Sequence, residues 1–363
     1  MYKIALELTK NCNLRCSYCY QPRFTNTMDI ETACRAIDLG IERAKVLPTR
    51  KLLISFFGGE PLLQFPQMVS LVEYSKSAAD GYDIAYELTT NGTLLQARHI
   101  DFFAEHQFFL KVSIDGLPED HNLNRRNPGN ADSYQLVIRN LDLFMDYQRK
   151  LKKPIQVSMV ISRNNYTHFL ANIRHLADLG FRMFDTALNF TDCWSDQELA
   201  GLRAEYEQVV DLYFERIQNK RGFIWTFIDN GLMPQIKPRK NYYCGAGISS
   251  MYVNTEGELY PCYACFKDEV RIGSTAEGIN EARANRFKHY QRELTGDCID
   301  CSIQAYCPAC DCLMMNMEQT NDFYTVPKMF CEHAKMRYEL TNKLHHNPEW
   351  KRMLEMMSVP KGV

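Results

Sequence analysis

Six short apolar segments alternate with helical segments before residue 220, and this alternation constrains the fold more than any other feature. Each apolar segment is rich in β-branched or aromatic residues and ends near a Gly, Asn or Asp, as buried strands do. Strands are expected at Lys3–Thr9, Leu52–Phe57, Ile84–Thr90, Phe109–Ile114, Ile155–Ile161 and Phe184–Phe190. Helices are expected at Ile30–Val46 after an Asp29 cap, Gln67–Ala79, Gln96–His106, Tyr134–Lys150, His168–Leu179 and Asp196–Lys220. The pattern predicts an α/β fold whose parallel sheet is either open or curled into a barrel.

Polar and glycine-rich motifs follow several of these strands. Cys12 comes after the first strand, Gly58–Pro61 after the second, Asn91 at the end of the third and Asp115 at the end of the fourth. Ligands of parallel sheets sit at the carboxyl ends of the strands. One site assembled from several loops is therefore expected at this edge.

The chain contains 14 cysteines and begins without a basic-then-apolar export signal. Thiols of a protein that is not exported stay reduced, which favours metal ligation or redox chemistry over disulfides. Three cysteines lie at 12, 16 and 19, nine lie between Cys244 and Cys331, and only Cys34 and Cys193 stand alone. Two metal-binding regions are predicted.

The first region, Cys12-x3-Cys16-x2-Cys19, places three thiolates on one short loop. A structural zinc site needs four protein ligands, whereas three thiolates suit an iron-sulfur cluster with one iron left open for a substrate or cofactor. The alternative is a zinc loop that a distant residue such as Cys34 completes.

The composition excludes several other classes. Lys and Arg number 42 against 44 Asp and Glu, so the net charge of -2 gives no broad surface for nucleic acid. Apolar residues make up 45% of the chain, yet no window offers an uncharged membrane span. A cytoplasmic protein is expected.

The run Cys12–Tyr20 (CNLRCSYCY) resembles the CxxxCxxC signature of the radical S-adenosylmethionine (SAM) enzymes. Gly58–Pro61 resembles their second motif, and Ser113–Gly116 followed by His121 and Arg125 resembles a stretch of the peptide-modifying branch. The resemblance implies a partial (β/α)6 TIM barrel. It also implies a [4Fe-4S] cluster on Cys12, Cys16 and Cys19, whose fourth iron binds the amino and carboxylate groups of SAM and whose electron releases a 5′-deoxyadenosyl radical.

The same resemblance implies a set of SAM-binding residues. Paired glycines let a backbone approach closely, a carboxylate accepts hydrogen bonds from an ammonium, and an arginine can pair with a carboxylate. The implied set is Tyr18, through its backbone, Gly58, Gly59, Glu60, Ser113, Asp115, Arg125 and Leu188.

The second cysteine region resembles the SPASM domain, an extension that carries two auxiliary [4Fe-4S] clusters. The resemblance implies one cluster on Cys298, Cys301, Cys307 and Cys331, and another on Cys244 and Cys262 completed from Cys265, Cys310 and Cys312. Cysteines flank position 311, where the family pattern differs, so the choice between Cys310 and Cys312 stays open. The alternative is a pair of zinc ribbons.

The expected domains are a radical SAM barrel at 1–220, a linker at 221–243 with weak periodicity, a SPASM domain at 244–340 and a helical tail at 341–363.

The resemblance implies a peptide maturase that abstracts hydrogen from a ribosomal precursor peptide, leading to a crosslink or an oxidation. The rival within the family is an anaerobic sulfatase-maturating enzyme, which forms formylglycine and carries an Asp after its auxiliary cysteine; here Tyr263 follows Cys262. The rival of another class is a non-catalytic iron-sulfur electron carrier or zinc scaffold. A flavodoxin- or ferredoxin-type reductant is implied. Because only 11 residues precede Cys12, a leader is expected to bind either a separate leader-binding protein or the surface of the barrel and linker.

Overall fold

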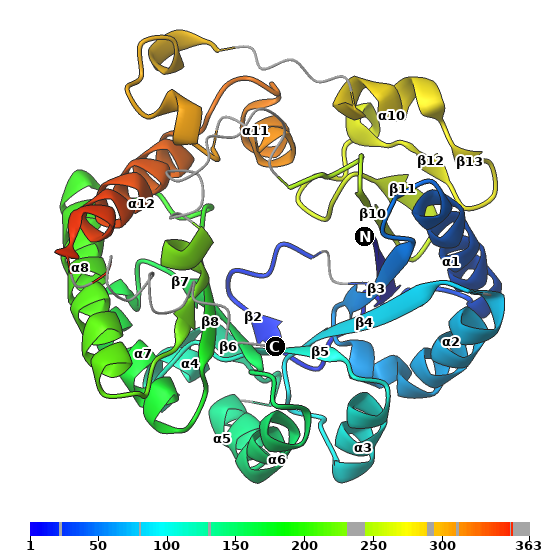
Figure 1. Cartoon of the computed structure of the whole chain (residues 1–363), viewed down its shortest axis with the longest axis horizontal. Helices are drawn as coiled ribbons and strands as arrows, with labels where there is room; N and C mark the ends of the chain where they lie inside the picture. The colour runs from blue at the N-terminus through cyan, green and yellow to red at the C-terminus, as the bar shows by residue number, and fades with distance from the viewer. Residues whose placement is uncertain are drawn as a thin grey trace.

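The computed structural model describes residues 1–21, 24–79, 81–129, 132–230, 244–288, 294–309, 312–348 and 350. All six predicted strands are present and pair in parallel, in the order β1-β3-β4-β5-β7-β8. Figure 1 shows the sheet curving into a partial barrel with helices around its outer side, which confirms the predicted fold class. The barrel strands are β1 Tyr2–Thr9, β3 Lys51–Gly58, β4 Asp83–Thr90, β5 Phe109–Ser113, β7 Gln156–Ile161, β8 Met183–Leu188 and the short β9 Ile224–Trp225.

The predicted helices are present outside the barrel with one correction, and the structure adds α4, which the sequence did not predict. The helix predicted over 134–150 is two helices, because Arg139 and Asn140 form a turn in which the Asn140 N–H donates to the Val137 carbonyl, three residues back, at 3.0 Å. Asp29 caps α1 as expected, its carboxylate accepting the Thr32 N–H at 2.8 Å. The helices are α1 Ile30–Lys45, α2 Phe65–Ala78, α3 Ala97–Glu105, α4 Pro118–Asn124, α5 Ser133–Ile138, α6 Leu141–Leu151, α7 Phe169–Asp178 and α8 Asp196–Gln218, with 3-10 turns η1 Pro61–Gln64 and η2 Tyr166–His168.

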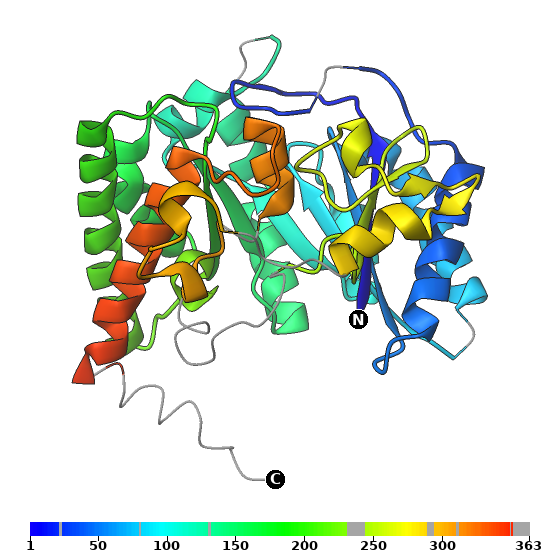
Figure 2. The same ribbon diagram turned by 90° about the horizontal axis from the view of Figure 1, so that it is seen from above.

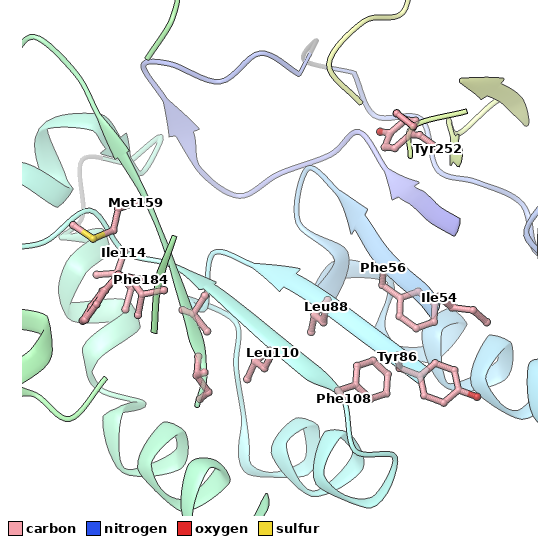
Figure 3. Packing of buried hydrophobic residues seen from close by; sticks show 14 of the residues in the cluster. Ile54, Phe56, Tyr86, Leu88, Phe108, Leu110, Ile114, Met159, Phe184 and Tyr252 are labelled. Atoms are coloured by element: carbon pink, nitrogen blue, oxygen red, sulfur yellow. The ribbon is translucent and has the colours of Figure 1, made fainter. Parts of the chain in front are cut away.

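The main hydrophobic core lies between the sheet and the outer helices. Alternate strand residues such as Ile54, Phe56 and Leu88 are fully buried on this side, and Phe108 stacks on Tyr86 with ring centroids 5.2 Å apart (Figure 3). The residues between them face the inside of the barrel, because successive strand side chains point to opposite faces. Many of these inner residues are polar and only partly buried, so the inside of the barrel is not a packed core.

The cysteine-rich region extends the barrel at both edges. Its first strand pairs in parallel with β1, and its helix α12 (Lys328–His346) contacts α8 (Figures 1 and 2). The predicted boundary between 340 and 341 falls inside that helix. The elements are β10 Ser250–Val253, β11 Glu258–Tyr260, β12 Gly273–Ser274, β13 Gly278–Ile279, α10 Glu281–Lys288, α11 Leu313–Thr320 and α12 Lys328–His346, with 3-10 turns η3 Asp268–Val270, η4 Gly296–Cys298 and η5 Gln304–Tyr306.

No described helix is both long and apolar enough to cross a bilayer.

Candidate active site

The loop after β1 carries Cys12, Cys16 and Cys19, and it is held by residues far along the chain. Within the loop, β2 (Arg15–Cys16) pairs with β6 (Arg125–Arg126), so that Cys16 lies opposite Arg125. The Ser17 N–H also donates to the Asn124 carbonyl at 2.8 Å. The cysteine loop is thereby joined to the segment that follows β5.

The three thiols of this loop lie close enough to influence each other. Burial raises the pKa of Cys12 to about 11; the Leu14 N–H, 3.4 Å from its sulfur, lowers that pKa, while Glu60, Cys16 and Cys19 raise it further. Burial also raises the pKa of Cys16, although the Arg125 guanidinium lowers it. Iron binding must therefore displace protons from these thiols, as is usual for thiolate ligands.

Gly58, the last residue of β3, and Gly59 let this strand end touch the cysteine loop. A Cβ on Gly58 would lie 2.3 Å from the Thr9 carbonyl oxygen, and one on Gly59 would lie 2.3 Å from that of Asn11. The Gly59 N–H donates to Thr9 at 2.7 Å. These glycines thus allow the backbone before Cys12 to pack closely against the end of β3. Their contact with SAM stays a prediction.

Glu60 is fully buried and joins two strand ends. Its carboxylate accepts the Leu62 N–H at 3.0 Å, the Thr90 hydroxyl at 2.7 Å and the Asn91 N–H at 2.7 Å. Burial raises the pKa of Glu60 to about 7, against the lowering effect of these three donors. The carboxylate predicted to meet the cofactor ammonium thus has partners within the chain, and its SAM contact also stays a prediction.

Asp115 and Arg125 form a buried ion pair beside the cysteine loop. The Oδ1 atom of Asp115 and the Nη2 atom of Arg125 are 3.0 Å apart, the Val160 N–H donates to the same oxygen at 3.0 Å, and the Tyr18 hydroxyl donates to the other oxygen. Arg125 also lies over the Tyr18 ring, 5.4 Å from its centroid. The structure therefore brings together three of the residues predicted at the site.

Two buried nitrogen atoms next to this pair lack a partner within the described residues, namely Nε of Arg125 and Nε2 of His121. A buried donor without a partner is costly, so a guanidinium in this state suits an anionic ligand. This fits the carboxylate of SAM. Ser113 lies on the inner side of β5, two residues before Asp115, whereas Leu188 lies in the hydrophobic core at the end of β8; their SAM contacts stay predictions.

The auxiliary cysteines also gather into two groups. Burial raises the pKa of Cys262, and the neighbouring Cys312, Cys244 and Cys265 raise it further, which places these four cysteines together. Cys310 lies outside the described residues, so the structure brings Cys312 to this group and does not test Cys310. Ala264 N–H donates to the Cys262 sulfur at 3.4 Å.

The second group is formed by Cys298, Cys301, Cys307 and Cys331. The first three lie in a small hydrophobic cluster with Ile303 and Ala334. Burial raises the pKa of Cys331, and Cys307 and Cys298 are near enough to raise that pKa further. This is the set that the sequence predicted for one auxiliary cluster.

Among the residues that the structure describes, no three His, Cys, Asp or Glu side chains surround a position for a single metal ion.

Three aromatic rings connect the first cysteine loop with the Cys262 loop. Tyr263 stacks on Phe57 at 5.2 Å and on Tyr20 at 5.8 Å between centroids. Tyr20 and Tyr263 remain 54% and 47% exposed. The residues after Cys19 and Cys262 thus share one surface at the carboxyl end of β3.

Asn91, which the sequence placed at the same edge of the sheet without a role, is a neighbour of the first cysteine site. Its side-chain amide donates to Asn13 at 2.9 Å and lies 3.8 Å from the Cys12 sulfur. The Thr90-Asn91-Gly92 turn at the end of a strand was visible in the sequence, but its partner was not.

The chain is similar to several known proteins. A model of the radical SAM superfamily matches residues 6–161. A cysteine-type anaerobic sulfatase-maturating enzyme of Clostridium perfringens (strain 13 / Type A) is 26% identical over 294 residues, which cover 73% of this chain and 75% of that protein.

Two solved structures with bound peptides share the fold. Native anSMEcpe with bound AdoMet and Cp18Cys peptide superposes with a TM-score of 0.76 at 19% identity, covering 96% of this chain and 98% of the other. Streptococcus suis SuiB bound to precursor peptide SuiA superposes with a TM-score of 0.62 at 15% identity, covering 91% and 75%. Residues 6–161, which form most of the barrel, match the radical SAM superfamily, and the whole chain with its cysteine-rich region is similar to radical SAM enzymes of the SPASM branch.

Proposed function

We propose that this enzyme matures a ribosomally made peptide by abstracting hydrogen from one of its side chains, which leads to a crosslink or an oxidation. Two similar folds hold peptides, the Cp18Cys peptide in anSMEcpe and the precursor SuiA in SuiB. The similarity extends over almost the whole chain in the first case, including the cysteine-rich region. A peptide is therefore the substrate class that the fold and its relatives favour.

The observation that carries the proposal is the stack of Tyr20, Phe57 and Tyr263. It joins the residue after Cys19 to the residue after Cys262, and two of its rings are half-exposed. A side chain that rests on this stack lies between the first cysteine site and the nearer auxiliary site. Aromatic surfaces of this kind bind peptide side chains with little loss of conformational entropy.

Cys12, Cys16 and Cys19 would hold the [4Fe-4S] cluster, and Arg125 would bind the SAM carboxylate through its unpaired Nε. When bound, these groups supply the electron and the 5′-deoxyadenosyl radical of the reaction. Asp115 keeps the Arg125 guanidinium in place through their 3.0 Å contact. Gly58 and Gly59 keep the end of β3 against the cysteine loop, so the stack and the cofactor residues are fixed relative to each other.

The two other cysteine groups would hold auxiliary [4Fe-4S] clusters, one on Cys298, Cys301, Cys307 and Cys331 and one on Cys244, Cys262, Cys265 and Cys312. A cluster with four thiolate ligands has no open iron for a substrate. Its roles would therefore be to transfer electrons and to stabilise a region with a small hydrophobic core. The enzyme would take electrons from a flavodoxin or ferredoxin.

Formylglycine formation is the second candidate, because the Clostridium perfringens relative is a sulfatase-maturating enzyme. The family resemblance described above implies that those enzymes carry an Asp directly after the auxiliary cysteine. Here Tyr263 occupies that position and its ring is stacked on Phe57, so no carboxylate follows Cys262. We therefore favour a different peptide modification.

The test is anaerobic reconstitution followed by incubation with SAM and dithionite. We expect about twelve irons per chain and release of 5′-deoxyadenosine, whereas a zinc scaffold would contain zinc without sulfide. A sulfatase peptide containing the target Cys should gain no formylglycine. Formation of formylglycine would establish the second candidate, and a fully loaded protein that releases no 5′-deoxyadenosine would refute both.

A further inference from the structure

Two lysines and one glutamate form a charged cluster on the inner wall of the barrel. Lys3 of β1 and Lys111 of β5 both contact Glu87 of β4, at 2.7 Å and 2.9 Å, and the Ser55 hydroxyl donates to the same carboxylate at 2.6 Å. All four residues lie on the inner face, because Ala5, Ser55 and Glu87 are register partners and side chains alternate along each strand. The cluster therefore faces the inside of the barrel.

The cluster has more positive than negative charge. Burial alone would raise the pKa of Glu87, but Lys111 and Lys3 lower it to about 2, so the carboxylate is ionised. Two ammonium groups then share one carboxylate, which leaves a surplus of one positive charge. A surplus charge in a partly buried place favours an anionic ligand that neutralises it.

The two ammonium groups remain available to such a ligand. The side chains of Lys3 and Lys111 are 35% and 21% exposed, whereas that of Glu87 is only 7% exposed. Each ammonium has three donors, and the contacts with Glu87 use one of them.

The other acids on the inner face do not use these donors. Glu7 accepts the Thr255 N–H at 3.1 Å, and Asp185 of β8 accepts from Gln156 at 2.9 Å and from Thr226 at 2.6 Å. Asp83 of β4 pairs with Lys51 at 2.7 Å. None of these three acids has a hydrogen bond to Lys3 or Lys111 within the described residues.

We infer that Lys3 and Lys111 form a carboxylate-binding subsite inside the barrel, which takes an acidic side chain or the C-terminal carboxylate of the peptide. This inference rests on the proposed function and adds a substrate class to it. Glu87 holds the two lysines in place and is not itself a ligand.

The position of the subsite predicts where the acid lies in the substrate. Glu87 is level with Ala5 of β1, and Thr9 ends that strand four residues later. At about 3.3 Å per residue the subsite lies about 13 Å below the end of the strand, where the cysteine loop begins. An extended peptide covers this distance in about four residues, so the acid is expected about four positions from the modified residue.

The test uses synthetic peptide pools in which one position is fixed as Glu or as Gln, each made with a free or an amidated C-terminus. Reconstituted enzyme is incubated with each pool, SAM and dithionite, and 5′-deoxyadenosine above the peptide-free rate is measured. We expect 5′-deoxyadenosine release to be about tenfold higher with Glu pools than with Gln pools, or with free C-termini than with amidated ones. The reason is that a carboxylate forms a charge-assisted hydrogen bond with the lysines where an amide forms a neutral one. The comparison of the two carboxylate sources identifies which one binds.

The variants K3M and K111M should lose this preference, and K111R should keep most of it. The control K343M removes an exposed lysine that pairs with Glu207 on the outer surface, and it should leave the preference unchanged. Iron content and circular dichroism exclude misfolding, and binding of the preferred pool without reductant should weaken about tenfold in K111M.

Equal stimulation by Glu and Gln pools, with either C-terminus, would overturn the carboxylate subsite while leaving the peptide function intact. Release of 5′-deoxyadenosine that no peptide pool increases would overturn the peptide function, and the subsite with it.

Discussion

Gly59 offers a sharp test of how the barrel positions the cysteine loop. In Gly59→Ala the added Cβ would lie 2.3 Å from the Asn11 carbonyl oxygen and 2.7 Å from its carbon. These are backbone atoms, so no side-chain rotation relieves the overlap. The Asn11 carbonyl must move by about 0.7 Å or more to reach even a tight contact.

The consequence can be estimated from the contacts around this carbonyl. It accepts the Glu60 N–H at 2.9 Å, and a movement of this size stretches that bond to its limit, at a cost of about 1–3 kcal/mol. Asn11 directly precedes Cys12, so the first cluster ligand moves as well. A displacement of about 1 Å at a reacting centre lowers the rate about 100-fold. We expect 5′-deoxyadenosine formation to fall by this factor.

The assay compares wild type, Gly59→Ala and Gly129→Ala after anaerobic reconstitution. Gly129 is the matched control, because a Cβ there meets nothing closer than 3.5 Å. Iron and sulfide content, the electron paramagnetic resonance signal with and without SAM, and the rate of 5′-deoxyadenosine release are measured for each. A Gly59→Ala enzyme that keeps its rate within about threefold of wild type at equal iron content would refute the reasoning.

Three further predictions concern other parts of the molecule. Asp29→Ala removes the cap of α1 and should lower the free energy of unfolding by about 1 kcal/mol in denaturant titration. Glu87 has a pKa of about 2 in the folded protein against 4.5 as the reference value, so its contribution is fully present above pH 4.5 and is lost as the pH falls through 2. That contribution is about 3 kcal/mol, and Glu87→Gln should abolish this part of the pH dependence of unfolding. Cys307→Ser should lower the iron content from about twelve to about eight per chain; an unchanged content would remove Cys307 from the auxiliary ligands.

The local features of this protein were predictable from the sequence, because they depend on residues that are close in the chain. The strand segments have the length and composition of buried parallel strands, and each of the six forms one. Asp29 lies three residues before Thr32, the spacing of an N-cap. The break at Arg139 and Asn140 was missed because the apolar period continues across it and no Gly or Pro marks it.

The contacts that assemble the site were less predictable, because they join residues that are distant in the sequence. The pairing of Cys16 with Arg125 depends on how α4 ends, and the N–H of Asn91 reaches Glu60 only because β3 and β4 are neighbours. Lys3 and Lys111 are ordinary surface residues in the sequence, and only the strand register brings both to Glu87. Composition gives no signal for such a cluster.

The position of the auxiliary cysteines follows from the two edges of the partial barrel. An open sheet leaves unpaired backbone groups at β1, and β10 covers them by pairing with Lys3–Leu6. At the other edge α12 lies along α8, where Lys343 contacts Glu207 at 2.7 Å and Lys328 contacts Asp196 at 3.2 Å.

Because the chain between β10 and α12 must connect these two edges, its cysteines are carried across the open side of the barrel (Figure 1). The pairing of β10 with β1 thus also sets the Cys262 loop beside the Cys12 loop, because β1 leads directly into the Cys12 loop. Exposed surface ion pairs contribute little individually, so the α12 contacts alone would not hold this arrangement. The parallel pairing of β10 with β1 is therefore the contact on which the spacing of the two cysteine loops depends most.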